Sequence, residues 1–197
     1  KIRDGCVKIH YVPKKCSFKD LGYLDDITAL KQSSNYYQFM TAIKLTGNTY
    51  KYNMDLPVTV NDFNKYRDVF AMFGLGSSTG IDFPRENTGI KGSTISSDLY
   101  LNLAIGQYDT YTSLQILNYI NTIANNGVRY KLSLAKRNPE VLNQVALDKE
   151  YFARIKEGFY QVVNGGTANN YVDKKYMASG KTGTAQSYYS KDITTIN

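Results

Sequence analysis

Two short groups of polar residues, far apart in the chain, carry residue types that could bind and process an amide. Ser33-Ser34-Asn35 places hydroxyls beside a side-chain amide, which both donates and accepts hydrogen bonds. Gly180-Lys181-Thr182-Gly183-Thr184 combines a cation with two hydroxyls and two glycines. Lys181 and Thr182 can bind a carboxylate, the first by charge and the second by a hydrogen bond. The Thr184 backbone N–H could stabilise a developing oxyanion, an interaction worth about 3 kcal/mol.

Each group also has a plainer interpretation. A serine or asparagine at a helix start commonly caps the helix, so Ser33 to Asn35 could serve only that purpose. The Lys181 segment could be the polar edge of a hairpin, with Gly180 and Gly183 allowing another backbone to approach closely. A catalytic interpretation therefore requires that the two groups meet in the fold.

Two other patterns predict no chemistry. Ser133-Leu134-Ala135-Lys136 is a literal Ser-x-x-Lys, but it ends a strand-like segment, and Asn138-Pro139 would stop a helix soon after it. We interpret it as a coincidence. Gly180-Lys181-Thr182 lacks the glycine five residues before Gly180 that a phosphate-binding loop requires, because that position is Lys175. Nucleotide binding is therefore not expected.

The elements around the two groups follow from the spacing of apolar residues. Leu21, Leu24, Ile27 and Leu30 predict a helix after Ser17 that ends near Gln32. A second helix should run to Gly47, with Ser34 or Asn35 as its cap. Ser33 would then lie in the break between two helices, where its hydroxyl could relay a proton.

The rest of the chain predicts three further helices and two strands. The helices are expected from Asn61 to Phe73, from a cap at Thr112 to an end at Asn126-Gly127, and from Asp148 to a stop at Gly165-Gly166. The second of these should be the most buried helix of the chain. The strands are expected from Val128 to Leu134 and around Lys181.

Composition limits the class of protein. Of 197 residues, 42% are hydrophobic, which is enough to bury a substantial core, and 24 basic against 17 acidic residues give a net charge of +7. The basic residues form no block and the tyrosines no stripe among them, so nucleic-acid binding is not expected. No apolar run could span a bilayer, so any membrane anchor must lie outside this chain. His10 is the only histidine, so a Cys and His metal site lacks ligands.

Cys6 and Cys16 have nine residues between them, a spacing that matches neither a redox nor a zinc motif. They could form a disulfide if the protein works outside the cytoplasm, or remain two ordinary thiols. The sequence leaves both alternatives open.

Six ordered segments resemble the class B penicillin-binding proteins, the monofunctional peptidoglycan D,D-transpeptidases. They include the two polar groups, which correspond to the second and third parts of the Ser-x-x-Lys, Ser-x-Asn and Lys-Thr-Gly signature. The segments are Ala29–Asn35, Phe73–Gly76, Thr79–Pro84, Ala104–Gln107, Ile123–Gly127 and Gly180–Gln186. The resemblance implies an α/β (α+β) transpeptidase fold of the penicillin-binding and serine β-lactamase type, with a helical subdomain and an antiparallel sheet. Residues 1–197 would form one partial domain, incomplete at both ends.

The resemblance also implies a mechanism. A serine would attack the D-Ala-D-Ala carbonyl of a stem peptide and pass the acyl group to an amine on a neighbouring strand. Ser33 would relay protons, and Asn35 would hold the amide of the substrate or β-lactam. Lys181 and Thr182 would engage the carboxylate, Gly183 would contact the substrate or β-lactam, and the Thr184 N–H would form half of the oxyanion hole. No cofactor or metal is implied.

The chain departs from the family in lacking a usable Ser-x-x-Lys, which in the family precedes Ser-x-Asn. We therefore expect that the nucleophile lies in a missing upstream segment and that this chain alone is inactive. The implied partners are stem peptides, β-lactam antibiotics and the cell-wall synthesis machinery, at the outer face of the cell membrane. One alternative is a non-catalytic module of the same fold that binds peptidoglycan or a partner protein. Another is a β-lactamase or carboxypeptidase, in which water accepts the acyl group.

Overall fold

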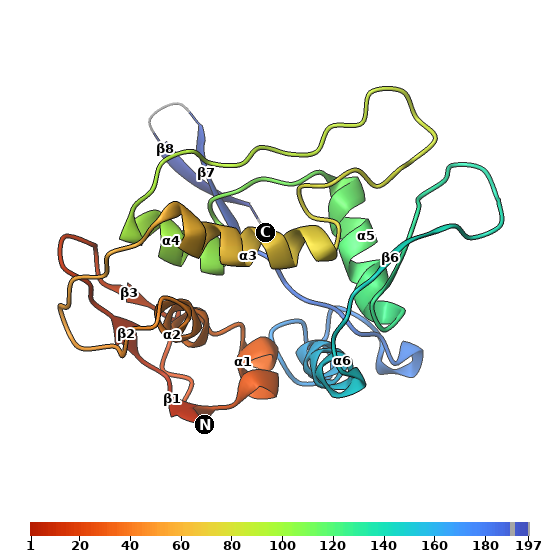
Figure 1. The fold of residues 1–197 in the computed structure, drawn as a ribbon. Helices are drawn as coiled ribbons and strands as arrows, with labels where there is room; N and C mark the ends of the chain where they lie inside the picture. The colour runs from red at the N-terminus through yellow and green to blue at the C-terminus, as the bar shows by residue number, and fades with distance from the viewer. Residues whose placement is uncertain (190–191, 197) are drawn as a thin grey trace. The chain divides into compact units, whose positions relative to one another are not determined.

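A computed structural model describes residues 1–189 and 192–196 (Figure 1). Chain contacts divide them into two compact units, one formed by Lys1–Leu56 with Arg154–Asn197 and the other by Pro57–Ala153. The described residues form six α-helices, one short 3-10 helix and four two-stranded antiparallel sheets. This mixture of helices and small antiparallel sheets agrees with the predicted α/β (α+β) class.

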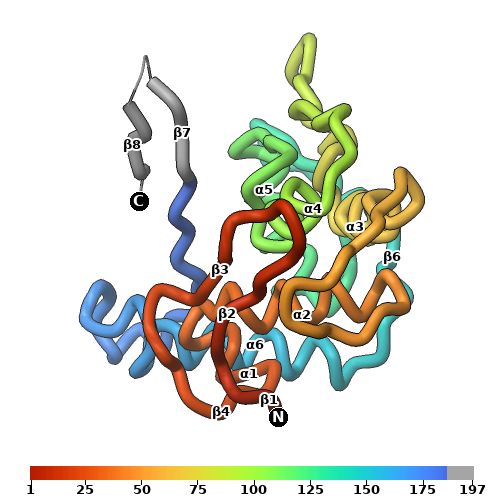
Figure 2. The backbone as a smooth tube through the Cα atoms, turned by 90° about the vertical axis from the view of Figure 1, so that its left-hand side faces the viewer, coloured from red at the N-terminus to blue at the C-terminus, as the bar shows by residue number. Residues whose placement is uncertain are grey.

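The first unit carries both polar groups. Its helices are α1 (Asp26–Gln32), α2 (Asn35–Leu45), most of α6 (Lys149–Val163) and the 3-10 helix η1 (Lys174–Tyr176). Its strands pair as β1 (Ile2–Arg3) with β4 (Tyr23–Leu24), β2 (Cys6–Val7) with β3 (Lys15–Cys16), and β7 (Ala185–Tyr189) with β8 (Asp192–Ile196). Helix α2 packs against β2 and β3, whose hairpin is the red loop of Figure 2.

A compact apolar core holds these elements together. Its side chains are at most 7% exposed and come from the strands, from the segment after β2, from α1 and α2, and from α6: Val7, Ile9, Leu24, Ala29, Phe39, Ala42, Ile43, Phe159, Val162 and Val163. Helices α1 and α6 lie side by side (Figure 1), and Arg154 forms an ion pair with Asp26 between them. Gly158 faces Leu30, and a Cβ at position 158 would lie 2.7 Å from the leucine side chain. The close packing fixes the end of α1, where Ser33 follows.

Cys6 and Cys16 lie opposite each other in the β2–β3 pair and form a disulfide. Of the two alternatives that the sequence leaves open, the structure therefore has the disulfide.

The second unit contains α3 (Val60–Met72), α4 (Ser97–Ala104), α5 (Ser113–Ala124) and the pair of β5 (Val128–Tyr130) with β6 (Val141–Gln144). Aromatic rings form much of its interior, with ring centroids 5.4 Å apart for Phe63 and Tyr100 and 5.7 Å for Tyr66 and Tyr100. Helix α4, which apolar spacing did not predict, contributes the fully buried Tyr100 and Leu101.

Several predicted boundaries were wrong for local reasons. Helix α1 begins at Asp26, because Asp25 and Thr28 form a reciprocal capping box, and Leu24 belongs to β4. Strand β5 ends at Tyr130, because the Leu132 N–H donates to Thr79 O instead of continuing the β5–β6 ladder. Lys181 precedes a strand rather than lying in one, since β7 begins at Ala185.

Helix α5 is capped by Thr112 as predicted, but it is not the most buried helix. Leu117 and Ile120 are exposed, whereas Gln115, Asn118 and Thr122 are fully buried. The buried side chains are satisfied by hydrogen bonds, among them Gln115 to Ser77 O and Asn118 to Tyr130 O. This helix therefore buries a polar face, which its apolar spacing could not predict.

Candidate active site

Ser33 lies in a tight turn between α1 and α2. Its backbone is left-handed, with φ 55° and ψ 49°, which is uncommon for a residue other than glycine. The Ser33 N–H donates to Leu30 O at 3.2 Å, and the Ser34 N–H donates to Ala29 O at 2.9 Å. These bonds close α1 and hold the half-buried Ser33 in the break between helices.

The next two residues start α2. Ser34 is the cap, since its hydroxyl accepts a hydrogen bond of 3.1 Å from the Tyr37 N–H. Asn35 is the first residue of the helix and is half-buried. Within residues 1–185 its side-chain amide makes no hydrogen bond, and its role in holding a ligand amide stays a prediction.

Lys181 joins the second polar group to the first. Its Nζ donates to Ser33 Oγ at 2.8 Å and to Thr182 O at 2.9 Å. The preceding residue, Gly180, donates its N–H to Phe159 O in α6 at 3.1 Å, which fixes the approach of this segment. Two groups separated by 148 residues thus meet in one polar site.

The environment of Lys181 changes its acidity. Although the residue as a whole is exposed, its ammonium end loses hydration against the surrounding protein, and this desolvation lowers the pKa of Lys181. The ammonium nevertheless has hydrogen-bond acceptors in Ser33 and Thr182. A ligand carboxylate placed there would stabilise the charged form.

Thr167 is a member of this site that the sequence did not predict. Its hydroxyl lies 2.8 Å from that of Thr182, and its N–H donates to Lys31 O at 3.3 Å. The adjacent Gly166 has no room for a side chain, because a Cβ there would lie 2.6 Å from Lys31 O. The loop after α6 therefore connects the end of α1 to the Lys181 segment. Its only sequence signal was the helix stop at Gly165-Gly166.

The remaining predicted residues, Gly183 and Thr184, lie on an exposed stretch just before β7. Among the described residues, and apart from its chain neighbours, no atom lies within 4 Å of the position that a Cβ at Gly183 would occupy. The oxyanion role of Thr184 stays a prediction.

Ser133 lies in a loop of the other unit and not at the start of a helix. Its hydroxyl is 3.2 Å from Asp82 Oδ2 and 2.6 Å from Ala135 O. These contacts agree with the interpretation of its Ser-x-x-Lys as a coincidence.

Within the described ranges, no three His, Cys, Asp or Glu side chains are grouped so that they could hold a metal ion. No helix in those ranges is both long and apolar enough to cross a membrane.

Ser-x-Asn and Lys-Thr-Gly elements together are typical of serine β-lactamases and penicillin-binding proteins. Comparison with known families agrees, because residues 17–196 match the penicillin-binding protein transpeptidase domain. The chain therefore belongs to this family, as its motifs predicted.

Its relatives are class B penicillin-binding proteins. The chain is 41% identical over 193 residues to penicillin-binding protein 2A of Bacillus subtilis, covering 89% of this chain and 27% of that protein. It is 35% identical over 146 residues to penicillin-binding protein 2B of Streptococcus pneumoniae, covering 63% of this chain and 22% of that protein. The solved structure of penicillin-binding protein 2B from strain R6 of that species superposes with a TM-score of 0.87 at 31% identity. That match covers 98% of this chain and 36% of the solved chain.

Proposed function

We propose that this chain is part of a serine-type D,D-transpeptidase that cross-links peptidoglycan stem peptides and is inhibited by β-lactams. The observation that carries the proposal is the 2.8 Å contact between Lys181 and Ser33, which assembles two of the three signature elements in one site. The family match over residues 17–196 supports it.

In the proposed reaction, a serine of a Ser-x-x-Lys segment outside these 197 residues attacks the carbonyl of the penultimate D-alanine. The C–N bond breaks, D-alanine leaves with a proton, and the acyl group remains on the serine. An amine from a second stem peptide then takes the acyl group and frees the serine. A β-lactam acylates the same serine when its ring opens.

The residues of this chain bind and direct the reacting groups. Lys181 and Thr182 hold the terminal carboxylate, and Asn35 holds the peptide amide. Since Ser33 Oγ accepts a hydrogen bond from Lys181, its own proton is free to point toward the leaving nitrogen. Ser33 can therefore pass a proton to that nitrogen, and the Thr184 N–H stabilises the oxyanion.

The proposed enzyme works at the outer face of the cell membrane, together with the cell-wall synthesis machinery. The disulfide supports this location, because such bonds persist in oxidising compartments.

The direct test is incubation of the whole protein with a D-Ala-D-Ala stem peptide and an acceptor amine. The proposal expects release of D-alanine and a cross-linked product, both lost after Lys181→Ala. Release of D-alanine with hydrolysed peptide alone would indicate a carboxypeptidase. If the protein forms neither product but still binds the peptide, the non-catalytic module would be favoured.

A further inference from the structure

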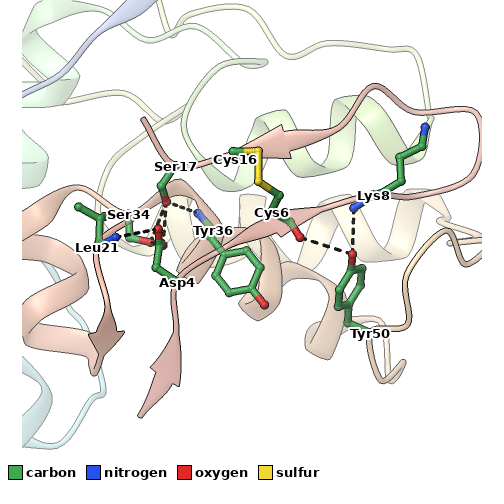
Figure 3. The surroundings of a disulfide bond; sticks show 9 residues. All are labelled: Asp4, Cys6, Lys8, Cys16, Ser17, Leu21, Ser34, Tyr36 and Tyr50. Carbon is green, nitrogen blue, oxygen red and sulfur yellow. Dashed lines mark hydrogen bonds between the residues drawn. A yellow bond between two sulfur atoms is a disulfide. The ribbon is translucent and has the colours of Figure 1, made fainter. Parts of the chain in front are cut away.

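A buried carboxylate lies behind the Ser33 turn. Asp4 is 7% exposed and comes from the segment between β1 and β2. Its Oδ1 accepts hydrogen bonds of 2.8 Å from the hydroxyls of both Ser17 and Ser34, and its Oδ2 accepts one of 3.3 Å from the Leu21 N–H. Figure 3 shows these side chains converging. None of the active-site contacts involves Asp4, so its burial needs another explanation.

The two hydroxyls connect Asp4 to the first turn of α2. Ser34 Oγ accepts from the Tyr37 N–H at 3.1 Å, and Ser17 Oγ accepts from the Tyr36 N–H at 3.2 Å. Each hydroxyl thus gives its single proton to Asp4 and receives one from the helix backbone. A negative charge at a helix N-terminus is also favoured by the helix dipole. Asp4 therefore fixes the start of α2 through Ser17 and Ser34.

The disulfide holds this arrangement together. Asp4 precedes Cys6 by two residues and Ser17 follows Cys16 directly, while the two cysteines are bonded across the β2–β3 pair (Figure 3). The hairpin therefore presents Asp4 and Ser17 side by side to Ser34.

We propose that Asp4 is a positioning residue that acts through Ser34 to hold Ser33 and Asn35 in their reactive placement. Ser33 precedes Ser34 and Asn35 follows it, so a shift of Ser34 moves both functional side chains. Misplacement by about 1 Å at a reacting site can cost about 100-fold in rate. The inference rests on the proposed function, because it assumes that Ser33 and Asn35 serve acylation.

The test uses the whole protein and a fluorescent penicillin, with the acylation rate constant measured separately from non-covalent affinity. Asp4→Asn keeps the size of the side chain but replaces a charged acceptor by a neutral one and turns an NH₂ toward the Leu21 N–H. We expect the acylation rate constant to fall at least about tenfold, with affinity changed less than about threefold and an unchanged near-UV spectrum. The matched control is Asp55→Asn, an exposed carboxylate paired with His10, which should acylate within about twofold of the wild type.

A double-mutant cycle tests whether Asp4 affects the acylation rate through Ser34. Because Asp4 acts through Ser34, the Asp4→Asn/Ser34→Ala protein should lose no more rate than the more impaired single variant. If Asp4→Asn does not fold, Ser17→Ala takes its place, since it removes one donor to Asp4 and should still slow acylation at least about threefold.

The outcomes separate the two proposals. A wild-type protein that takes no label would refute the proposed function and this inference with it. A labelled wild type with Asp4→Asn at the same rate, or with additive losses in the cycle, would overturn the positioning role alone. If the Asp4→Asn protein does not fold, a Ser17→Ala protein that acylates at the wild-type rate would overturn the positioning role of Asp4.

Discussion

The contact between Ser33 and Lys181 gives the site its chemical character at the scale of single residues. A hydroxyl that accepts from an ammonium is polarised for proton transfer, and the ammonium beside Thr182 is placed to bind a carboxylate. In the proposed function the two tasks are separate, with proton relay assigned to Ser33 at the helix break and carboxylate binding to the segment before β7.

The lowered pKa of Lys181 predicts how the site responds to alkaline pH. Carboxylate binding needs the ammonium, so affinity for a β-lactam should fall at a pH below the usual lysine value of about 10.4. Burial of the charged Lys181 also lowers the free energy of unfolding at any pH below the folded-state pKa of this lysine. This loss of stability disappears as the pH rises through the usual lysine pKa, because the lysine is then neutral in both the folded and the unfolded state. In Lys181→Arg the guanidinium stays charged, so the alkaline loss of affinity should disappear. The same alkaline limb in both proteins would contradict a role for Lys181.

Thr167 offers a second test at this scale. Thr167→Val keeps the shape of the side chain but removes the hydroxyl 2.8 Å from that of Thr182. The loss of one such hydrogen bond, about 1 kcal/mol, should weaken carboxylate binding about fivefold and leave the acylation rate constant unchanged. Thr41→Val, at an exposed position of α2, is the matched control and should bind normally. Equal binding by the two variants would show that Thr167 does not support the site.

Residue types and spacing singled out Ser33, Asn35, Lys181 and Thr182, because short motifs carry their chemistry, and their roles stay predictions. Thr167 and Asp4 were not predictable in this way. Their positions depend on which loops fold back on α1 and α2, and no local pattern encodes that contact. Supporting groups around a site are set by tertiary packing rather than by motif.

Among the elements, the β2–β3 hairpin is cross-linked by a disulfide. Its disulfide joins two cysteines that are ten positions apart, and closing a loop of this size stabilises a fold by about 3 kcal/mol. Cys16 is exposed, so a reductant can reach the bond.

Reduction of this disulfide should therefore lower the melting temperature of the protein. The drop should equal that of the Cys6→Ser/Cys16→Ser variant, because both remove the same constraint. The variant is its own control for side effects, since reductant should not change its melting temperature further. An unchanged melting temperature, in a sample whose free thiols have been titrated, would contradict a stabilising role for the hairpin bond.

The prediction of helices and strands succeeded where local sequence signals were strong. It failed where tertiary packing determined the boundaries of an element or its buried face. Thr112 capped α5 and the Gly165 stop ended α6 as expected, since caps and glycines act locally. Leu24 joined a strand despite its helical spacing, because Asp25 started α1 one residue later. The buried polar face of α5 shows that apolar spacing alone does not establish which side of a helix faces the core.

At the scale of the whole molecule, the chain covers 27% of the length of penicillin-binding protein 2A and 36% of the solved penicillin-binding protein 2B chain. The first unit brings together all the site residues described here, whereas the second carries none of the predicted site residues. The assignment of residues 1–197 to one partial domain stays a prediction.

The most direct test of the account is the intact mass of the whole protein after incubation with a β-lactam, followed by peptide mapping. We predict one adduct with the full mass of the β-lactam, on the serine of a Ser-x-x-Lys segment outside these 197 residues, and a slower appearance of the adduct in Lys181→Ala. An adduct on Ser133, or no adduct on a folded whole protein, would contradict the proposed transpeptidase site.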